Sequence, residues 1–262
     1  MINEKNNTNS TLEKALDILK YFTSECPVRG LSEISRISSI PKATVYRFFN
    51  TFEKSGFLEK VDVTGKQNQY RLGMKFFELG SIVADSIELK EIALPYMTKL
   101  RDELNEDIHL IIRDKNQALC VEKLTCNHPV RLVTKIGRVT SLAAGACARA
   151  ILSFLDDEEI DKILREDCFE KYTENTIVNK EELLNSIKES REKGVIVSFG
   201  ELELQTVSIA SPIFNHSGKA IASISVAGPE QRFNKEILEK CEEAVKRYAR
   251  DISAMLGYKY KD

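Results

Sequence analysis

Between residues 12 and 72, apolar spacing and chain-breaking residues follow one another in an order that few small folds allow. Apolar residues three or four positions apart indicate one side of a helix. Two such runs come first: Leu12, Leu16, Leu19 and Phe22, and then Leu31, Ile34 and Ile37. Pro27 and Gly30 separate these two helices. Pro41 suits the first position of a third helix, where a missing N–H costs nothing, and Gly56 ends that helix.

The third helix, in PKATVYRFFNTFEKSG, has two different sides. Its core-facing stripe follows the i, i+3, i+4, i+7 pattern: Val45, Phe48, Phe49 and Phe52. At about 100° per residue, a second set points away from the core: Ala43, Tyr46, Arg47, Asn50 and Lys54. FLEKVDV and QYRLG, on either side of the polar segment TGKQN, predict a hairpin. Three helices followed by a hairpin predict a winged helix-turn-helix over residues 11–73.

The outward side of this third helix carries side chains that suit double-stranded DNA. The major groove admits one α-helix, Arg binds guanine with two hydrogen bonds, and Asn does the same with adenine. We therefore predict base contacts by Arg47 and Asn50, with Ala43 and Tyr46 beside them on the same face. Contacts to phosphates or to the minor groove are predicted for Lys42, Thr44 and the wing residues Lys66, Gln67 and Asn68. The alternative is a solvated face on a module that binds another protein.

The composition, 42% apolar and 30% charged over 262 residues, is that of a soluble protein with two domains. No apolar run approaches the roughly 18 residues of a membrane span, and MINEKNNTNS lacks the apolar core of a secretory signal. We expect a cytoplasmic chain with a flexible tail over residues 1–10. Six scattered cysteines without a Cys-x-x-Cys pair favour free thiols. Residues 1–80 carry 12 Lys and Arg against 9 Asp and Glu, which fits a polyanionic partner.

A linker helix is predicted over residues 74–90. Its apolar residues share one side: Phe76, Leu79, Val83 and Ile87. Nothing in the small front domain obviously covers this stripe. Pairing with the same helix of a second chain would bury it, and this dimer is our expectation; packing on the rear domain is the alternative.

Residues 91–262 mix strands and helices. Three strand candidates, DIHLIIRD, QALCVEKL and PVRLVTKI, precede helices in AAGACARAILSFL, from Asp156 to about Arg165, and in KEELLNSIKESREKG. GVIVSFG, TVSIASPIF and KAIASISVAG return to the strand pattern, and a helix from Asn234 to about Leu256 follows them. This order predicts an α+β fold in which an antiparallel sheet holds a small molecule.

The quoted segments resemble one family along nearly the whole chain. STLEKALDILKYF, LSEISRISSIPKATVYRFFNTFEKSGFLEK and QYRLG are similar to the front domain of the IclR family of bacterial transcriptional regulators. GRVTSLAAGACARAIL, GVIVSFGELELQTVSIASPIF and AIASISVAGPEQRF resemble its effector-binding domain in the same order, so the match spans about residues 10–257. The resemblance implies a GAF-like domain that binds a small effector, usually an organic acid, and dimers or pairs of dimers on DNA. Repressor and activator are both compatible with these residues.

An effector site needs a few hydrogen-bond donors in an apolar setting, and backbone N–H groups at a helix start are such donors. SLAAGACARAIL places Gly145, Ala146 and Cys147 at a predicted helix start, where small side chains let a ligand approach the backbone. Tight packing of the helix on the sheet is the alternative.

The family resemblance adds further effector contacts. It implies contacts by Ala146, Cys147, Ser198 and Ser208, with Thr206 beside them. Ser198 and Ser208 stand where many relatives have Asp and Cys, Arg149 where Lys is common, and Ala143 where His is frequent. Neutral hydroxyls change which ligand fits, and we expect an organic acid or a sugar acid. Ser223 and Ser225 either line the same cavity or face water.

Two other chemistries receive less support from the sequence. His109, Cys120, Cys126 and His128 have no standard zinc spacing, so we expect no metal and no cofactor. The sequence has no Gly-x-Ser-x-Gly and no phosphate-binding loop, so we expect no enzyme. The competing hypotheses are a thiol-based redox sensor or enzyme that uses Cys147 or Cys126, and a protein-interaction module without affinity for DNA.

Overall fold

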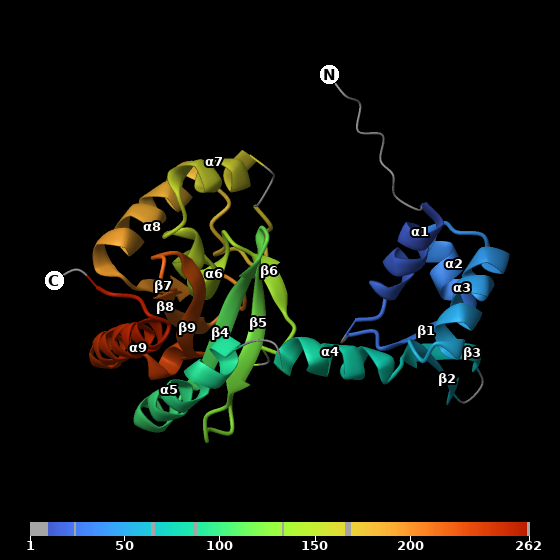
Figure 1. The fold of residues 1–262 in the computed structure, drawn as a ribbon, viewed down its shortest axis with the longest axis horizontal. Coiled ribbons are helices and arrows are strands. Elements are labelled where there is room, and N and C mark those ends of the chain that lie inside the picture. Colours follow the sequence, from blue (N-terminus) through green and yellow to red (C-terminus); the bar gives the residue numbers. More distant parts are fainter. Residues whose placement is uncertain are drawn as a thin grey trace. The chain divides into compact units, whose positions relative to one another are not determined.

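The computed structural model describes residues 10–23, 25–63, 66–85, 88–132, 134–165 and 169–260, and the chain forms two compact units, Met1–Ser86 and Ile87–Asp262 (Figure 1). The tail predicted for residues 1–10 lies outside the described residues except for Ser10, which begins the first helix. Each unit has its own buried apolar clusters. The α+β fold class is therefore built from two separate cores.

The first unit is the predicted winged helix-turn-helix. Its elements are α1 (Ser10–Leu19), β1 (Val28–Gly30), α2 (Leu31–Ser38), α3 (Lys42–Lys54), β2 (Leu58–Val63) and β3 (Lys66–Leu72). The sheet order is β1-β3-β2, with both pairs antiparallel. Strand β1 is three residues long and was not predicted, because so short a run has no detectable alternation.

The core of the first unit differs from the prediction in α1. Leu12 and Leu16 are 55% and 50% exposed, whereas Ala15, Ile18 and Phe22 are buried. Both sets have helical spacing, so periodicity alone does not choose between neighbouring stripes. The α2 and α3 contacts make the choice, because Ile18 packs in one cluster with Ile34, Val45 and Phe49.

The range predicted for the linker helix includes most of one helix and the start of another, and residues 86 and 87 between them lie outside the described residues. Helix α4 spans Lys75–Asp85, and a second helix, α5 (Glu88–Leu104), follows it. The Phe57 and Phe76 rings meet edge-on at 5.1 Å, which partly covers the predicted stripe, and Leu79 is 43% exposed. The side chains of Val83 and Ile87 lie outside the described residues. Helix α5 was missed because Pro95 lies inside it, and proline normally marks the end of a helix.

Gly73 provides a test of this packing. A Cβ atom at Gly73 would lie 2.2 Å from the carbonyl oxygen of Gly56, so alanine forces the backbone apart. We expect Gly73→Ala to lower the free energy of unfolding by about 1–3 kcal/mol, measured by urea unfolding. Gly80→Ala is the matched control, because a Cβ atom placed on Gly80 would have no neighbour within 4 Å. The control should stabilise the protein slightly, and equal effects of both variants would contradict this account.

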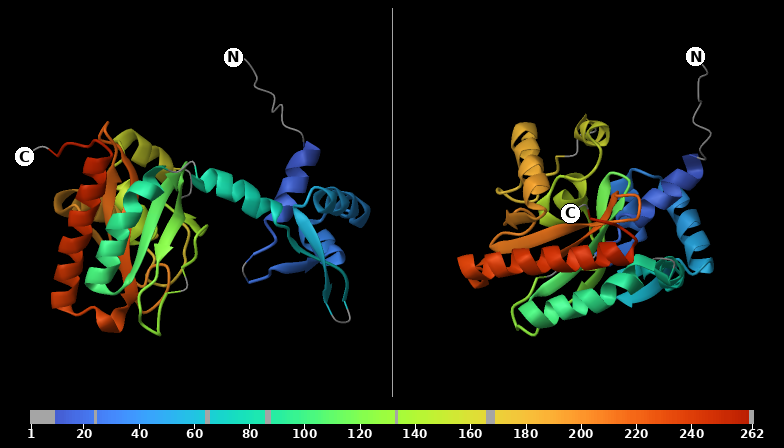
Figure 2. Two further views of the ribbon diagram at one scale, coloured as in Figure 1. Left: turned by 60° about the horizontal axis from the view of Figure 1, so that its bottom comes forward. Right: turned by 60° about the vertical axis from the view of Figure 1, so that its left-hand side comes forward.

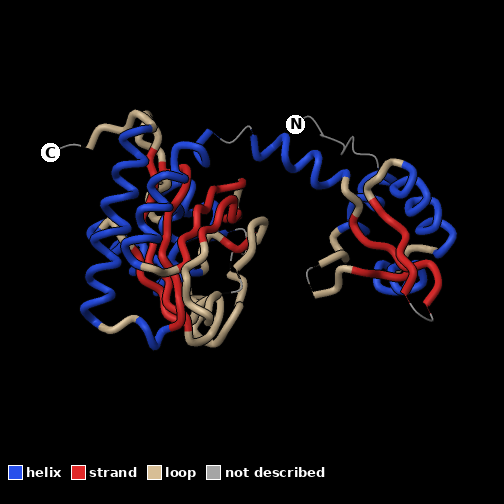
Figure 3. The backbone as a smooth tube through the Cα atoms, turned by 90° about the horizontal axis from the view of Figure 1, so that it is seen from below, coloured by secondary structure: helices blue, strands red, loops and turns tan. Residues whose placement is uncertain are grey.

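The second unit is built on a six-stranded antiparallel sheet in the order β6-β5-β4-β9-β8-β7. Figure 3 shows the strands of this sheet in red and the helices that pack on it in blue. The strands are β4 (Asp107–Asp114), β5 (Gln117–Leu124), β6 (Val139–Ser141), β7 (Ile196–Phe199), β8 (Thr206–Phe214) and β9 (Ala220–Pro229). The strand predicted in PVRLVTKI is wrong for the residues described there, which are irregular. Gly137, at φ 87°, lies in a turn, and its N–H donates to the Cys120 carbonyl oxygen of β5 at 2.8 Å. The antiparallel pairing with β5 continues from there into β6.

Helices cover both faces of this sheet (Figure 2). On one face, α5 and α9 (Lys235–Met255) pack on Ile108, Leu110 and Ile224. On the other face, α6 (Gly145–Leu152), α7 (Asp157–Arg165) and α8 (Lys180–Lys193) surround Ile111. A short 3-10 turn, η1 (Glu230–Arg232), leads into α9. Because alternate residues of β4 face opposite sides, His109 and Ile111 lie on the α6 side.

Candidate functional sites

The outward face of α3 is open to solvent. Lys42, Ala43, Tyr46 and Arg47 are exposed, and Thr44 and Asn50 are half-buried. Val45 and Phe49 hold the opposite side in the core. Within the described residues, no carboxylate neutralises Lys42, Arg47 or Lys54. The face therefore keeps free positive charge beside two groups that can bind base edges.

The wing lies between β2 and β3. Asn68 is exposed and has φ 55°. It lies where the register of β2 and β3 shifts, between the pairs Val61–Gln69 and Val63–Lys66. Asn adopts this left-handed conformation more readily than most residues, so it suits a bulge. The side chains of Lys66 and Gln67, which we also predicted to contact DNA, lie outside the described residues.

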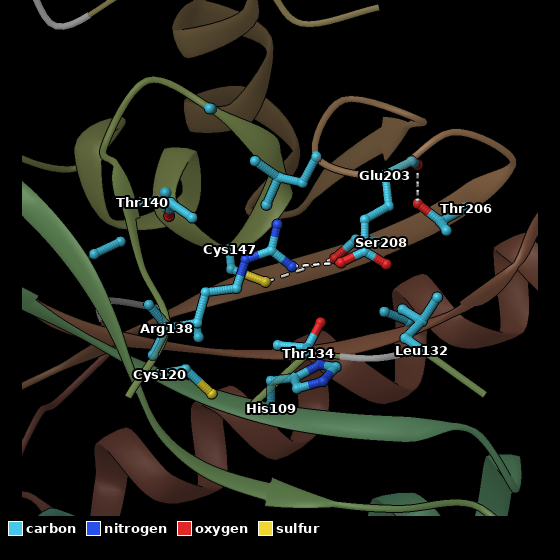
Figure 4. Close-up of a pocket in the computed structure, with 16 residues that line it drawn as sticks. His109, Cys120, Leu132, Thr134, Arg138, Thr140, Cys147, Glu203, Thr206 and Ser208 are labelled. Atoms are coloured by element: carbon cyan, nitrogen blue, oxygen red, sulfur yellow. Dashed lines mark hydrogen bonds and ion pairs between the residues drawn. The ribbon is translucent and has the colours of Figure 1, made fainter. Parts of the chain in front are cut away.

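A cavity lies on the α6 side of the second sheet (Figure 4). The volume of the cavity that is open to the centres of water-sized spheres is about 70 Å³. The strands and α6 contribute its walls, and the segment before β6 and the β7–β8 loop complete it. The polar lining residues are His109, Thr134, Arg138, Thr140, Cys147, Glu203, Thr206 and Ser208.

The cavity includes some of the residues predicted to bind an effector. Cys147, Thr206 and Ser208 line it. The N–H groups at the start of α6 are already bonded: Gly145 N–H donates to Glu201 Oε2 at 3.1 Å, and Ala146 N–H donates to Ser198 Oγ at 3.1 Å. Gly145 is therefore bonded to Glu201, and Ala146 to Ser198, and Gly145, Ala146 and Ser198 are not among the lining residues.

Cys147 sits between α6 and the sheet. Its Sγ lies 3.6 Å from Ser208 Oγ and 3.0 Å from Ser225 Oγ, and Ser223 Oγ donates to its carbonyl oxygen at 2.8 Å. Burial raises the pKa of the Cys147 thiol, although the hydrogen bonds with Ser225 and Ser208 act in the opposite direction. Ser223 and Ser225 are fully buried beneath Cys147, so they do not face water and are not among the lining residues.

Three charged or titratable lining residues were not predicted to lie in an effector cavity: Arg138, Glu203 and His109, the last of which was considered only for a metal. Arg138 Nη1 donates to Glu203 Oε1 at 2.5 Å, and this ion pair spans the cavity (Figure 4). His109 is buried, and burial, followed by the charge of Lys123, lowers its pKa to about 4. Along DIHLIIRD, alternation places His109 on the opposite face from its neighbours Ile108 and Leu110. This alternation is the one feature of the sequence that could have pointed to His109 as a lining residue.

The His and Cys residues considered for a metal do not gather. Asn105 Nδ2 lies 3.2 Å from His128 Nε2, and Cys126 N–H donates to Asp107 Oδ1, whereas His109 and Cys120 line the cavity. Across the described ranges, no three His, Cys, Asp or Glu side chains are grouped for a metal ion. The five cysteines in those ranges are free thiols, and Cys168 lies outside the described residues.

Comparisons with known proteins cover both units. A family model of the IclR helix-turn-helix domain matches residues 11–62, and a model of the bacterial transcriptional regulator IclR C-terminal domain matches residues 81–254. The HTH-type transcriptional regulator KipR of Bacillus subtilis is 41% identical over 252 residues, 96% of this chain and 99% of that protein.

Solved structures share the fold. Thermotoga maritima IclR is 27% identical with a TM-score of 0.74, covering 95% of this chain and 99% of that one. An IclR homolog from Microbacterium hydrocarbonoxydans complexed with 4-hydroxybenzoate has a TM-score of 0.78 at 23% identity, covering 94% and 99%. None of the helices among the described residues has the length and apolar character needed to cross a bilayer.

These matches confirm the resemblance found in the sequence. The front match covers the helices that present the outward face of α3, and the rear match covers the domain with the cavity. The relatives that match over both domains are regulators of transcription rather than enzymes. The chain belongs to the IclR family of bacterial transcriptional regulators and is a helix-turn-helix DNA-binding regulator.

Proposed function

We propose that a small organic acid or sugar acid binds the cavity on the α6 side and changes the affinity of this regulator for its operator. The observation that carries this proposal is the cavity itself, which combines Arg138, the His109 ring and several hydroxyls with apolar walls. Among the described residues, His109 Nε2 has no hydrogen-bond partner. Ligand sites typically have a few polar groups on an apolar lining. The Microbacterium homolog, similar in fold, is complexed with 4-hydroxybenzoate.

In this proposal, residues 11–73 bind the operator, with Arg47 and Asn50 at base edges. Ala43 and Tyr46 pack beside them, and the phosphate contacts come from Lys42, Thr44, Lys66, Gln67 and Asn68. The exposed, uncompensated cations of α3 support this assignment. Residues 74–90 form the linker and residues 91–262 the effector domain, where Cys147, Thr206 and Ser208 touch the ligand and Gly145, Ala146 and Ser198 shape the wall behind it.

The active form in this proposal is a homodimer or a pair of dimers. Helix α4 exposes Phe77 by 68% and Ile82 by 66%, and α1 exposes Leu12 and Leu16. A second copy of the chain would remove this apolar surface from water. The two α3 helices of a dimer then enter successive major grooves of the operator. The effector shifts the equilibrium between dimer arrangements that fit the operator and arrangements that do not.

A thermal-shift screen of small organic acids and sugar acids tests the effector proposal. A ligand that binds the folded state raises the melting temperature by mass action. We expect at least one acid to raise it, to change operator affinity by roughly fivefold to 150-fold, and to lose most of its effect in Ser208→Ala. Operator binding that no acid changes would contradict the proposal.

The thiol hypothesis has weaker physical support. The Cys147 pKa is raised by burial, and burial also raises the pKa of Cys126. Because the thiolate is the reactive form, both residues are poor nucleophiles near neutral pH. The paired Arg138 and Glu203 have no role in that hypothesis, whereas they suit a charged ligand.

A further inference from the structure

The cavity already contains a carboxylate. Within the described residues, the Glu203 carboxylate bonds to Arg138 alone, and the two side chains are 34% and 27% exposed. An ion pair this accessible to water is weak, because solvent screens the charges. A soluble anion that enters the cavity can therefore compete with Glu203 for the guanidinium.

A second polar group in the cavity lacks a partner. His109 Nε2 is buried and makes no hydrogen bond within the described residues, although the side chain is only 3% exposed. Nε2 is one of the two nitrogens of a neutral imidazole, and leaving such an atom unpaired in a buried place is costly. His109 lies below Arg138 in the same cavity, next to Thr134 (Figure 4). A ligand hydroxyl that reaches Nε2 would satisfy it.

Glu201 and Glu203, two residues of the β7–β8 loop, differ in how firmly their side chains are held. Glu201 is buried, bonds twice to Arg149 and also accepts the Gly145 N–H. Two residues later, the partly exposed Arg138 contact is the one polar contact of the Glu203 side chain among the described residues, while the Glu203 carbonyl oxygen accepts from Thr206 Oγ1 at 2.6 Å. The fixed end of the loop is therefore Glu201, and the Glu203 side chain can swing away without disturbing the start of α6.

The size of the cavity limits the ligand. The 70 Å³ open to the centres of water-sized spheres has room for about five to seven water-sized atoms or groups, at roughly 10–15 Å³ each. A three-carbon hydroxy acid has this number of non-hydrogen atoms. Longer acids need the space that Glu203 vacates.

We propose that Glu203 is a built-in competitor of the effector: a short hydroxy acid displaces it from Arg138 with its carboxylate and bonds His109 with its hydroxyl. Arg138 thereby selects the charge, His109 selects the hydroxyl, and Glu203 sets the affinity. The inference rests on the proposed function in using the same cavity, but it concerns binding to the full chain and can be tested without DNA.

Isothermal titration with lactate, propionate and 1,2-propanediol tests each role. Lactate has both groups, propionate lacks the hydroxyl, and propanediol lacks the carboxylate. Glu203→Gln should tighten lactate and propionate by about twofold to fivefold, because a partly exposed ion pair is worth less than about 1 kcal/mol. Arg138→Gln should weaken both roughly tenfold or more, because hydrogen bonds to charged groups are worth about 1.5–3 kcal/mol. His109→Phe should remove the advantage of lactate over propionate, about twofold to tenfold.

Two exposed residues of the same domain provide matched controls. Glu174→Gln and Arg165→Gln change the net charge equally but lie outside the cavity, so their affinities should equal that of the natural sequence. Circular dichroism checks that each variant is folded. Acid affinity that is unaffected by Glu203→Gln, or that changes equally in Glu174→Gln, would overturn the inference. Failure of either acid to bind even Glu203→Gln would overturn it as well.

Operator binding separates this inference from the proposed function. If the acids follow the pattern of the variants but leave operator affinity unchanged, the inference stands and effector control by this cavity fails. If a neutral compound changes operator affinity through the cavity and Arg138→Gln does not matter, effector control stands and this inference fails.

Discussion

Replacing Arg47 and Asn50 together by alanine is expected to abolish specific operator binding while the fold stays intact. Both side chains lie on the outward face of α3 and neither contributes to the buried cluster of the first unit. Each two-bond contact to a base edge is worth about 1–3 kcal/mol, so the double variant should lose roughly 30-fold to 10⁴-fold in operator affinity. Fluorescence anisotropy with operator and scrambled duplexes measures this loss.

The control is Asn185→Ala combined with Lys188→Ala, which removes an amide and a cation from the exposed side of α8. This control should bind the operator as the natural chain does. Residual binding of the Arg47 and Asn50 variant should be salt-dependent and equal for both duplexes, because phosphate contacts remain. An unchanged footprint would show that other residues read the bases.

The second large effect is expected at Arg149, the largest fully buried side chain of the chain's described part. Its guanidinium donates to Glu201 at 2.8 Å and 2.5 Å, and the two side chains are 2% and 5% exposed. Arg149→Met leaves the Glu201 carboxylate buried without its cation. We expect a loss of about 3–5 kcal/mol in the free energy of unfolding, measured by urea unfolding followed by circular dichroism.

Adding Glu201→Gln to Arg149→Met should restore much of this loss, because it removes the uncompensated charge and keeps an acceptor for the Gly145 N–H. Arg113→Met is the matched control: its ion pair with Glu159 is partly exposed, at 3.2 Å, and should be worth less than about 1 kcal/mol. Equal destabilisation by Arg149→Met and Arg113→Met would show that burial of the pair does not govern its contribution.

The spacing of apolar residues predicted the folds of both units, because apolar residues repeat every three or four positions in a helix and every second position in a strand. The α3 stripe with Val45 and Phe49 in the core, and strands β4, β5, β8 and β9, are present where alternation predicted them. The prediction failed where two apolar patterns with the same spacing compete, or where a segment is too short to show a pattern. Leu12 and Leu16 had the right spacing on the wrong side of α1, and β1 was too short to show any alternation.

The cavity could be predicted only in part. Cys147 and Ser208 were singled out by small side chains and family resemblance, and they line it. Arg138 and Glu203 are 65 positions apart, and neither residue looks unusual in its own segment. The bonds from Gly145 to Glu201 and from Ala146 to Ser198 were equally invisible, because each joins α6 to the distant β7 region.

The sequence by itself determined the local elements, the basic outward face of α3 and the family, because these follow from residue types at short spacing. Tertiary structure alone decided which stripe of α1 is buried and that Arg138, His109 and Glu203 share one cavity. It also decided that the N–H groups of Gly145 and Ala146 at the start of α6 are already bonded to Glu201 and Ser198. The physical reason is that contacts between distant segments depend on how the sheet curves and how the helices pack on it, and no short-range pattern encodes that arrangement.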